Sequence, residues 1–194
     1  MTTPITGAAP ETGTRSLTRS LNHVELVYAP GERPLARSLF ELLGFDVHDS
    51  GGPFLSARIA PGQTDLANNT LYASEVTAQQ WALEQVLRDQ LDGGALAAPA
   101  RAYFADLRAH PQRSCHFGIR YPGAGELDAA LDRVLHVERF APDLAGRVAV
   151  SGVFRPGDPG AYTDTMTQAF VRTDVIASGL LAFGQHIELQ WQVP

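Results

Sequence analysis

The stretch Ser20-Leu21-Asn22-His23-Val24-Glu25-Leu26-Val27-Tyr28 governs the interpretation of the chain, because a related stretch returns as Ser114-Cys115-His116-Phe117-Gly118-Ile119-Arg120-Tyr121. Both are short apolar runs rich in β-branched and aromatic residues and bounded by turn-forming residues, a pattern that predicts β-strands. Each contains one histidine, His23 in the first and His116 in the second. A recurrence of this kind indicates an internal repeat, and a repeat constrains the whole architecture.

The residues that follow the two strands are also alike. The first strand leads through a turn into an amphipathic helix that begins near Pro34 and ends at Gly44, and the second leads into a helical stripe from Leu127 to Leu135. Three further strands follow each helix, so the order β-α-β-β-β occurs twice. They are predicted at 45–48, 54–60 and 69–75, and again at 147–154, 165–173 and 185–192. The stretch 174–183 fits either an extended strand or a packed connection.

A helical segment separates the two repeats. Thr77 is the expected N-cap of its first helix, with Gln80 as the capping-box partner, and Gly93 follows its apolar face. A second helix is expected over 99–109. We therefore divide the chain into a disordered arm (1–19), a first module (20–76), a helical linker (77–111) and a second module (112–194).

Composition excludes several classes of function. The net charge is −6 with a pI of about 5.4 and no basic cluster, which disfavours a nucleic-acid partner. All 15 basic residues are arginines, so a Schiff-base lysine and a P-loop are both absent. No apolar run approaches the roughly 18 residues that span a bilayer, and residues 1–19 lack the apolar core of a secretory signal. The single cysteine is typical of a reducing cytoplasm, where we expect this protein.

The alternation of side chains along a strand places the chemically interesting residues on one face. His23 and Glu25 share a face of the first strand, His116 and Arg120 share a face of the fifth, and His186, Glu188 and Gln190 share a face of the last. The opposite faces are apolar and suit packing against helices. Two histidines and one carboxylate form the set that non-haem Fe(II) oxygenases use, and Mn, Ni, Co or Zn could also occupy it.

Here the chain resembles the vicinal oxygen chelate superfamily, which includes glyoxalase I, extradiol dioxygenases and bleomycin-resistance proteins. The resemblance rests on Leu21–Leu26, Phe40–Phe45, Cys115–Ile119 and Gly184–Leu189. It implies an α+β fold in which two βαβββ modules form a curved, partly open eight-stranded barrel. It also implies a divalent metal, Fe(II) before Mn, Ni, Co or Zn, held by His23, His116 and Glu188.

Other residues of these strands are candidates for lesser roles. In the family a fourth ligand comes from the last strand of the first module, where Glu75 would be the obvious donor and Tyr72 or Asn69 could contact substrate instead. His186 is expected to line the pocket or act as an acid or base, and Tyr72 and Tyr162 are possible proton donors. Glu25 could orient a ligand or pair with Arg120, and Cys115 is expected in the apolar core.

Two functions from different classes follow. The first is a metal-dependent enzyme acting on a small substrate through two adjacent oxygens, with dioxygenase chemistry before isomerase, lyase or epimerase chemistry. The second is a metal-free protein that binds or sequesters a small molecule, as drug-resistance proteins of this fold do. A homodimer is expected, with Trp81 and the linker helices as a candidate contact surface.

Overall fold

The computed structural model describes residues 21–64 and 68–193, so the predicted arm at 1–19 lies outside the described residues. The chain folds twice through the order β-α-β-β-β, with two helices between the repeats. The principal elements are β1 (His23–Tyr28), α1 (Arg33–Leu42), β2 (Asp46–His48), β3 (Phe54–Arg58), β4 (Thr70–Glu75), α2 (Ala78–Asp92), α3 (Ala97–Ala109), β5 (His116–Arg120), α4 (Ala124–Leu135), α5 (Val137–Phe140), β6 (Val148–Phe154), β7 (Met166–Thr173) and β8 (Gln185–Gln192).

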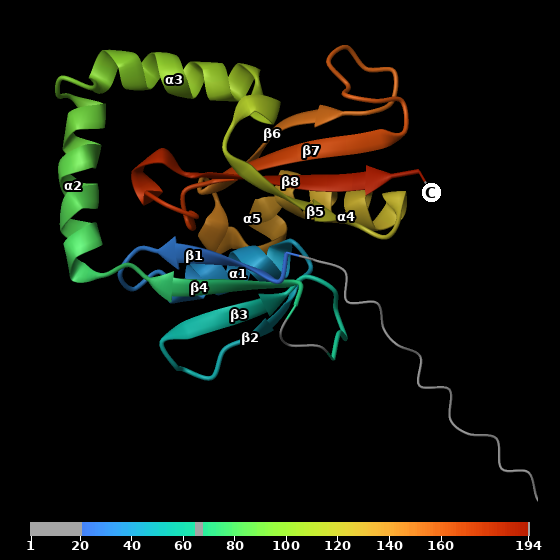
Figure 1. Cartoon of the computed structure of the whole chain (residues 1–194), viewed down its shortest axis with the longest axis horizontal. Coiled ribbons are helices and arrows are strands. Elements are labelled where there is room, and N and C mark those ends of the chain that lie inside the picture. Colours follow the sequence, from blue (N-terminus) through green and yellow to red (C-terminus); the bar gives the residue numbers. More distant parts are fainter. Residues whose placement is uncertain (1–20, 65–67, 194) are drawn as a thin grey trace, which may run out of the picture.

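The strands form two four-stranded mixed sheets of the same topology. The first has the order β1-β4-β3-β2 and the second the order β5-β8-β7-β6. In each sheet the first strand pairs in parallel with the last, and the other neighbours are antiparallel. In Figure 1 the edge strands β1 and β5 lie on the sides of their sheets that face the middle of the molecule. The α+β class and the repeat predicted from the sequence are confirmed, and the described strands form two four-stranded mixed sheets. The curved, partly open barrel stays a prediction.

Helices α1 and α4 cover the apolar faces of the two sheets and share one core. Leu39 and Phe40 of α1 and Leu127 and Leu131 of α4 belong to a single buried cluster that spans both modules. The predicted end of α1 at Gly44 is confirmed, because Gly44 has a φ of +88°. The amide of Phe45 donates to the Phe40 carbonyl in the six-residue bond of a Schellman motif.

The modules are joined firmly at one end. Val27 of β1 forms a two-residue antiparallel bridge with Ala177, which lies in the stretch left open by the sequence. The segment 174–183 is therefore a packed connection that reaches the edge of the first sheet. Nearby, the guanidinium of Arg147 binds both carboxylate oxygens of Glu32 at 3.0 and 3.1 Å and Asp174 at 2.6 Å.

Helices α2 and α3 form an arm along the margin of the molecule (Figure 1). The predicted N-cap is confirmed, since Thr77 Oγ1 accepts from the Gln80 amide at 3.1 Å. The Gln80 side chain donates to the Gly179 carbonyl and to Glu84, so it makes no capping-box return bond. Glu84 is fully buried and accepts from the amides of Leu181 and Ala182 at 2.8 Å each, which fastens the arm to the segment before β8.

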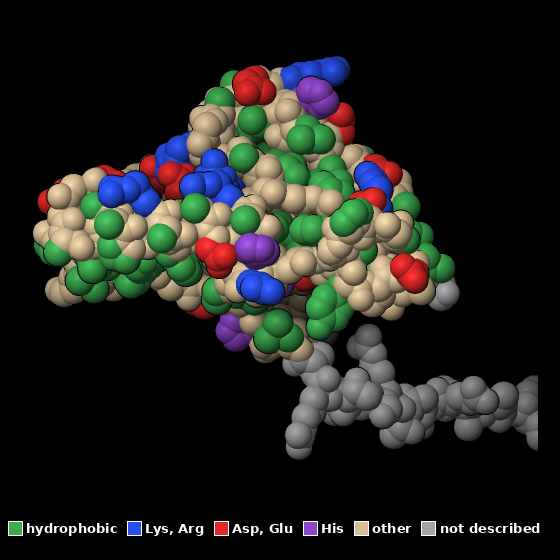
Figure 2. All heavy atoms as spheres, turned by 90° about the horizontal axis from the view of Figure 1, so that it is seen from above, with side chains coloured by type: hydrophobic (Ala, Val, Ile, Leu, Met, Phe, Trp, Pro, Cys, Tyr) green, Lys and Arg blue, Asp and Glu red, His purple; other side chains and the backbone are tan. Residues whose placement is uncertain are grey.

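Trp81 of this arm is partly buried, because it packs with Val76, Ala177 and Leu181 in a small second cluster, and its role in a contact between chains stays a prediction. The exposed apolar side chains of the arm are instead Leu83, Val86, Leu96 and Tyr103. In Figure 2 apolar side chains gather along one edge of the lobe that the arm forms. No described helix has both the length and the apolar character needed to cross a membrane.

Candidate functional site

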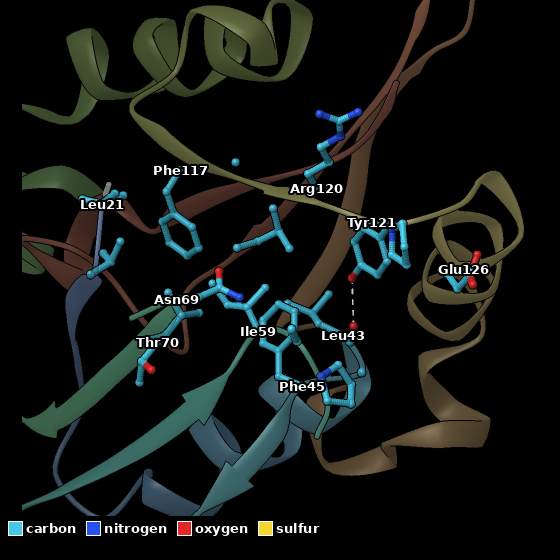
Figure 3. Close-up of a pocket in the computed structure, with 18 of the residues that line it drawn as sticks. Leu21, Leu43, Phe45, Ile59, Asn69, Thr70, Phe117, Arg120, Tyr121 and Glu126 are labelled. Atoms are coloured by element: carbon cyan, nitrogen blue, oxygen red, sulfur yellow. Dashed lines mark hydrogen bonds between the residues drawn. The ribbon is translucent and has the colours of Figure 1, made fainter. Parts of the chain in front are cut away.

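A cleft of about 1260 Å³ opens between the two modules, at the end opposite the Val27–Ala177 bridge. It lies between the edge strands β1 and β5, with the end of α1 and one side of α4 completing its walls (Figure 3). We call it the inter-module cleft. Its lining residues are Leu21, Asn22, His23, Val24, Leu43, Gly44, Phe45, Ile59, Ala60, Pro61, Asn69, Thr70, Leu71, His116, Phe117, Gly118, Ile119, Arg120, Tyr121, Pro122, Glu126, Ala129 and Arg133.

The walls of the cleft are mainly apolar. Phe117 from the second module lies opposite Ile59 and Phe45 from the first, as Figure 3 shows. Binding sites for small molecules are typically concave and apolar, about 300–1000 Å³ in volume, with a few polar groups that orient the ligand. The inter-module cleft has this character and exceeds the usual volume.

Two side chains of the second module bond the end of α1 beside the cleft. Tyr121 Oη donates to the Leu43 carbonyl at 2.8 Å, and Arg133 Nε donates to the Leu42 carbonyl at 2.6 Å. The last carbonyls of a helix have no partner within the helix, so these bonds satisfy groups that would otherwise need water. Burial is the main cause that raises the pKa of the Tyr121 hydroxyl, which therefore stays protonated and can keep donating.

His116 of β5 and Glu188 of β8 are brought together beside the cleft. His116 Nε2 lies 3.3 Å from Glu188 Oε2, and only 9 % of Glu188 is exposed. Gln168 of β7 donates to the other carboxylate oxygen at 2.6 Å. Gly118 makes room for this arrangement, since a Cβ there would lie 3.2 Å from Glu188 Oε2.

The hydrogen bond at the other nitrogen of His116 fixes its tautomer. Nδ1 lies 2.8 Å from the Ser114 carbonyl, and because a carbonyl can only accept, Nδ1 carries a proton. In neutral His116 the lone pair of Nε2 then faces a carboxylate oxygen, which is also an acceptor. A proton shared as an imidazolium–carboxylate pair, or a cation between the two atoms, would satisfy both groups.

His23 does not join this pair. Its ring lies on the exposed face of β1, stacked edge-on against Tyr72 with centroids 5.5 Å apart, and its Nδ1 donates to Asn22 Oδ1 at 2.8 Å. His23 and His116 both line the inter-module cleft, but they come from different sheets. Within residues 21–64 and 68–193, no three His, Cys, Asp or Glu side chains are grouped so that they could hold a metal ion. The predicted three-ligand set is therefore incomplete in this arrangement.

His186 is the register partner of His116 across β5 and β8, and it is buried. Its Nε2 lies 3.2 Å from Ser151 Oγ. Burial, and then the charges of His116 and Arg172, lower the pKa of His186, so the ring is neutral at pH 7. His186 is not among the residues that line the cleft, so it belongs to the polar face of the second sheet.

The tyrosines and Glu75 lie away from the His116–Glu188 pair. Tyr72 is on β4 of the first sheet, between the rings of His23 and Phe54. Tyr162 is 80 % exposed in the loop between β6 and β7. Glu75 stands at the far end of β4, where its carboxylate accepts from the Gly31 amide at 3.0 Å. Asn69 does line the cleft, as a substrate contact would.

Two further expectations differ from the structure. Glu25 accepts a long hydrogen bond of 3.4 Å from Ser74 in the first sheet, and no contact to Arg120 or to the His116–Glu188 pair is formed. Cys115 is exposed and lies just before β5, where the strand has not yet begun, so the alternation that assigned it to the core does not apply.

Sequence reasoning missed Gln168 and Arg133. Gln168 shares a face with Glu188 because its register partner on β8 is Gln190, two residues away. Arg133 has a weak signal, since it is a basic residue in the last turn of α4, where a cation suits the helix dipole. Its hydrogen bond to the end of α1 depends on how the two modules pack. A pattern of neighbouring residues in the sequence contains no information about that packing.

Comparisons of this chain with protein-family models, with curated proteins and with solved structures found no match.

Proposed function

We propose that this protein binds a small, largely apolar molecule in the inter-module cleft, and that it is a binding protein of the vicinal oxygen chelate type. The cleft between β1 and β5 carries the proposal, because apolar side chains from two sheets face each other across it. The duplicated β-α-β-β-β order supports the fold type. The Val27–Ala177 bridge supports the curved, partly open barrel, since it joins the edge of the first sheet to the connection between β7 and β8.

Binding in this cleft does not require a metal. Only two of the three proposed ligands, His116 and Glu188, lie in contact, and His23 is engaged with Asn22. A metal-free binding protein therefore agrees better with the described side chains than a metal enzyme does.

A neutral fluorescent probe of apolar sites, N-phenyl-1-naphthylamine, tests the proposal. At about 0.3 kcal/mol for each of about 17 non-hydrogen atoms, we expect one site per chain with a Kd near 200 µM. Ala129 of α4 is exposed and lines the cleft, so Ala129→Trp should obstruct part of the cleft without disturbing the core and should weaken binding. Ala124, exposed on the same helix but outside the cleft, gives the matched control Ala124→Trp, which should bind normally.

The proposal fails if the probe does not bind. It also fails if Ala129→Trp and Ala124→Trp bind the probe equally well, because the probe would then occupy another surface.

The second candidate function is a divalent-metal-dependent enzyme, with dioxygenase chemistry before isomerase or lyase chemistry. The convergence of His116 Nε2 and Glu188 Oε2, 3.3 Å apart, favours it. The metal would be Fe(II), with Mn, Ni, Co or Zn as alternatives. Elemental analysis of the purified protein tests it: one metal per chain that Glu188→Gln removes would support the enzyme, and metal-free protein that binds the naphthyl probe would exclude it.

A cytoplasmic homodimer completes the proposal. The exposed side chains Leu83, Val86 and Tyr103 of the arm support self-association, because exposed apolar groups on a helix pair gain from being covered. Light scattering on a size-exclusion column should give twice the mass of the 20.9 kDa chain, and Val86→Glu should return it to a monomer. A monomeric wild-type protein at all concentrations would contradict this part of the proposal.

A further inference from the structure

The charges around the inter-module cleft differ from those of the chain as a whole. The chain has 15 basic and 21 acidic residues. The cleft is lined by two arginines, Arg120 and Arg133, and by one acid, Glu126. A cleft whose charge is opposite to that of the surrounding protein favours a ligand of the complementary sign, because low-dielectric walls concentrate the field inside it.

Arg133 is placed to meet such a ligand. It is partly buried on α4, and its Nε is fixed by the bond to the Leu42 carbonyl. Gly44 lies directly against it, since a Cβ at Gly44 would be 3.0 Å from a terminal nitrogen of Arg133. The guanidinium is thus held in one orientation beside the apolar walls.

The terminal nitrogens of Arg133 form no hydrogen bond or ion pair with any residue that the structure describes. Glu126 is seven residues earlier on α4, about 10 Å away along the helix axis. In the smaller hollow on the other side of Arg133, Glu41 is bound to Arg37 and Asp143 to Ser38. Among the residues that the structure describes, neither of these carboxylates is bonded to the terminal nitrogens of Arg133.

Arg120 is a poorer candidate for the same role. It is exposed at the end of β5, and in Figure 3 its side chain points away from the other labelled side chains of the cleft. Arg133 is thus the cation that combines partial burial, a fixed orientation and free donors.

We propose that the ligand of the inter-module cleft is an apolar carboxylate, whose carboxylate is held by the terminal nitrogens of Arg133. This rests on the proposed function, because it specifies the ligand class of the same cleft. A carboxylate matches the planar donor fork of arginine, which can donate two parallel hydrogen bonds to it. The apolar part of the ligand lies between Phe117 and Ile59, on the walls that face each other across the cleft.

Two probes that differ in one group test the inference: 2-naphthoate, and 2-naphthylmethanol as its uncharged analogue. Both are titrated into the full-length protein by calorimetry. We expect 2-naphthoate to bind about 10- to 100-fold more tightly, as hydrogen bonds to a charged group allow. Added sodium chloride should lower the affinity of the protein for 2-naphthoate and leave its affinity for 2-naphthylmethanol unchanged.

Three variants separate binding from folding. Arg133→Gln should remove the preference for 2-naphthoate and leave the affinity for 2-naphthylmethanol unchanged. Arg133→Lys, which keeps the charge but loses the fork, should retain part of the preference. Glu126→Gln should raise the affinity for 2-naphthoate, because it removes the one acid among the described residues that line the cleft.

Equal affinities for the two probes in the wild-type protein would overturn the inference and leave the proposed cleft intact. The inference would also be overturned if Arg133→Gln and Arg133→Lys lost affinity for both probes to the same extent. Arg133 would then act only by supporting α1. If neither probe binds at a site that Ala129→Trp blocks, the proposed function itself fails.

Discussion

His186 is a buried histidine whose neutral form is favoured by its surroundings. The groups that face it are His116 on β5, Arg172 on β7 and Ser151 on β6, and two of these carry or can carry positive charge. The lowered pKa follows from burial first and from these charges second. The unfolded chain therefore takes up a proton at His186 more readily than the folded protein does.

This difference predicts a pH dependence of stability. As the pH falls below about 6.5, the ordinary pKa of histidine, protonation of the unfolded state should lower the free energy of unfolding. Above that pH the group should contribute no dependence. Thermal unfolding midpoints between pH 5 and 8 check this, and His186→Gln, which can still bond Ser151, should lose this component. An identical pH profile in the two proteins would contradict the assignment.

The faces of the strands were predictable from sequence, but the distances between them were not. Alternation correctly placed His116, Glu188 and His186 on one face of the second sheet, as the register partners on β5 and β8 show. The same rule could not tell that His23 would remain on the other sheet, stacked on Tyr72. The separation of His23 from the His116–Glu188 pair depends on how far β1 and β5 diverge. The packing of the two modules sets that divergence, and a pattern within one strand does not report it.

At the scale of elements, the α2–α3 arm depends on one buried carboxylate. Glu84 accepts two backbone bonds of 2.8 Å, from Leu181 and Ala182, and the other buried side chains of the two helices are Ala97 and Ala100. Helices of this length are marginal in isolation, so their order comes from this attachment and from the small clusters at their ends.

Glu84→Ala should therefore destabilise the arm more than the sheets. Loss of the carboxylate acceptor leaves one buried and one partly buried amide without a partner, at a cost of about 2–4 kcal/mol. Hydrogen exchange of α2 and α3 should accelerate, while β7 and β8 keep their protection. Glu41→Ala is the matched control, because its ion pair with Arg37 is exposed and contributes about 0.3–0.5 kcal/mol. Unchanged exchange in the arm of Glu84→Ala would show that other contacts hold it.

Periodicity and turn chemistry predicted the elements well, because these signals are local. The helix that ends at Gly44 and the helix capped by Thr77 both have the ends expected from their sequences. The segment 174–183 could not be assigned, because Ala177 is extended only through its bridge to Val27, a residue far away in the chain. The hydrogen bonds that Leu181 and Ala182 of that segment donate to Glu84 could not be predicted from a local pattern either, because the partners are far apart in the chain.

At the scale of the whole molecule, Arg147 fastens the two modules together. It binds Glu32 at the start of α1 with two parallel bonds, and Asp174 with a third. The first module contributes Glu32 and the second contributes Arg147 and Asp174. The bridge and this network close one end of the interface, and the cleft opens at the other.

Arg147→Leu should weaken the docking of the modules. We expect a loss of about 2–3 kcal/mol in the free energy of unfolding by urea, because two partly buried carboxylates lose their partner. Arg155→Leu serves as the control, since the Arg155–Asp128 pair is more than half exposed and should cost under about 0.5 kcal/mol. Equal losses in the two variants would mean that the network does not hold the modules.

A small apolar ligand that lies between β1 and β5 should shield the backbone amides around it from exchange. Hydrogen exchange of the native protein, measured with and without saturating N-phenyl-1-naphthylamine, reports where the ligand binds. We predict added protection in the β5 region 116–121, at the start of β1 and in α4, with none in β6 or the arm. Protection confined to the face of β6 and β7, or to α2 and α3, would contradict the account.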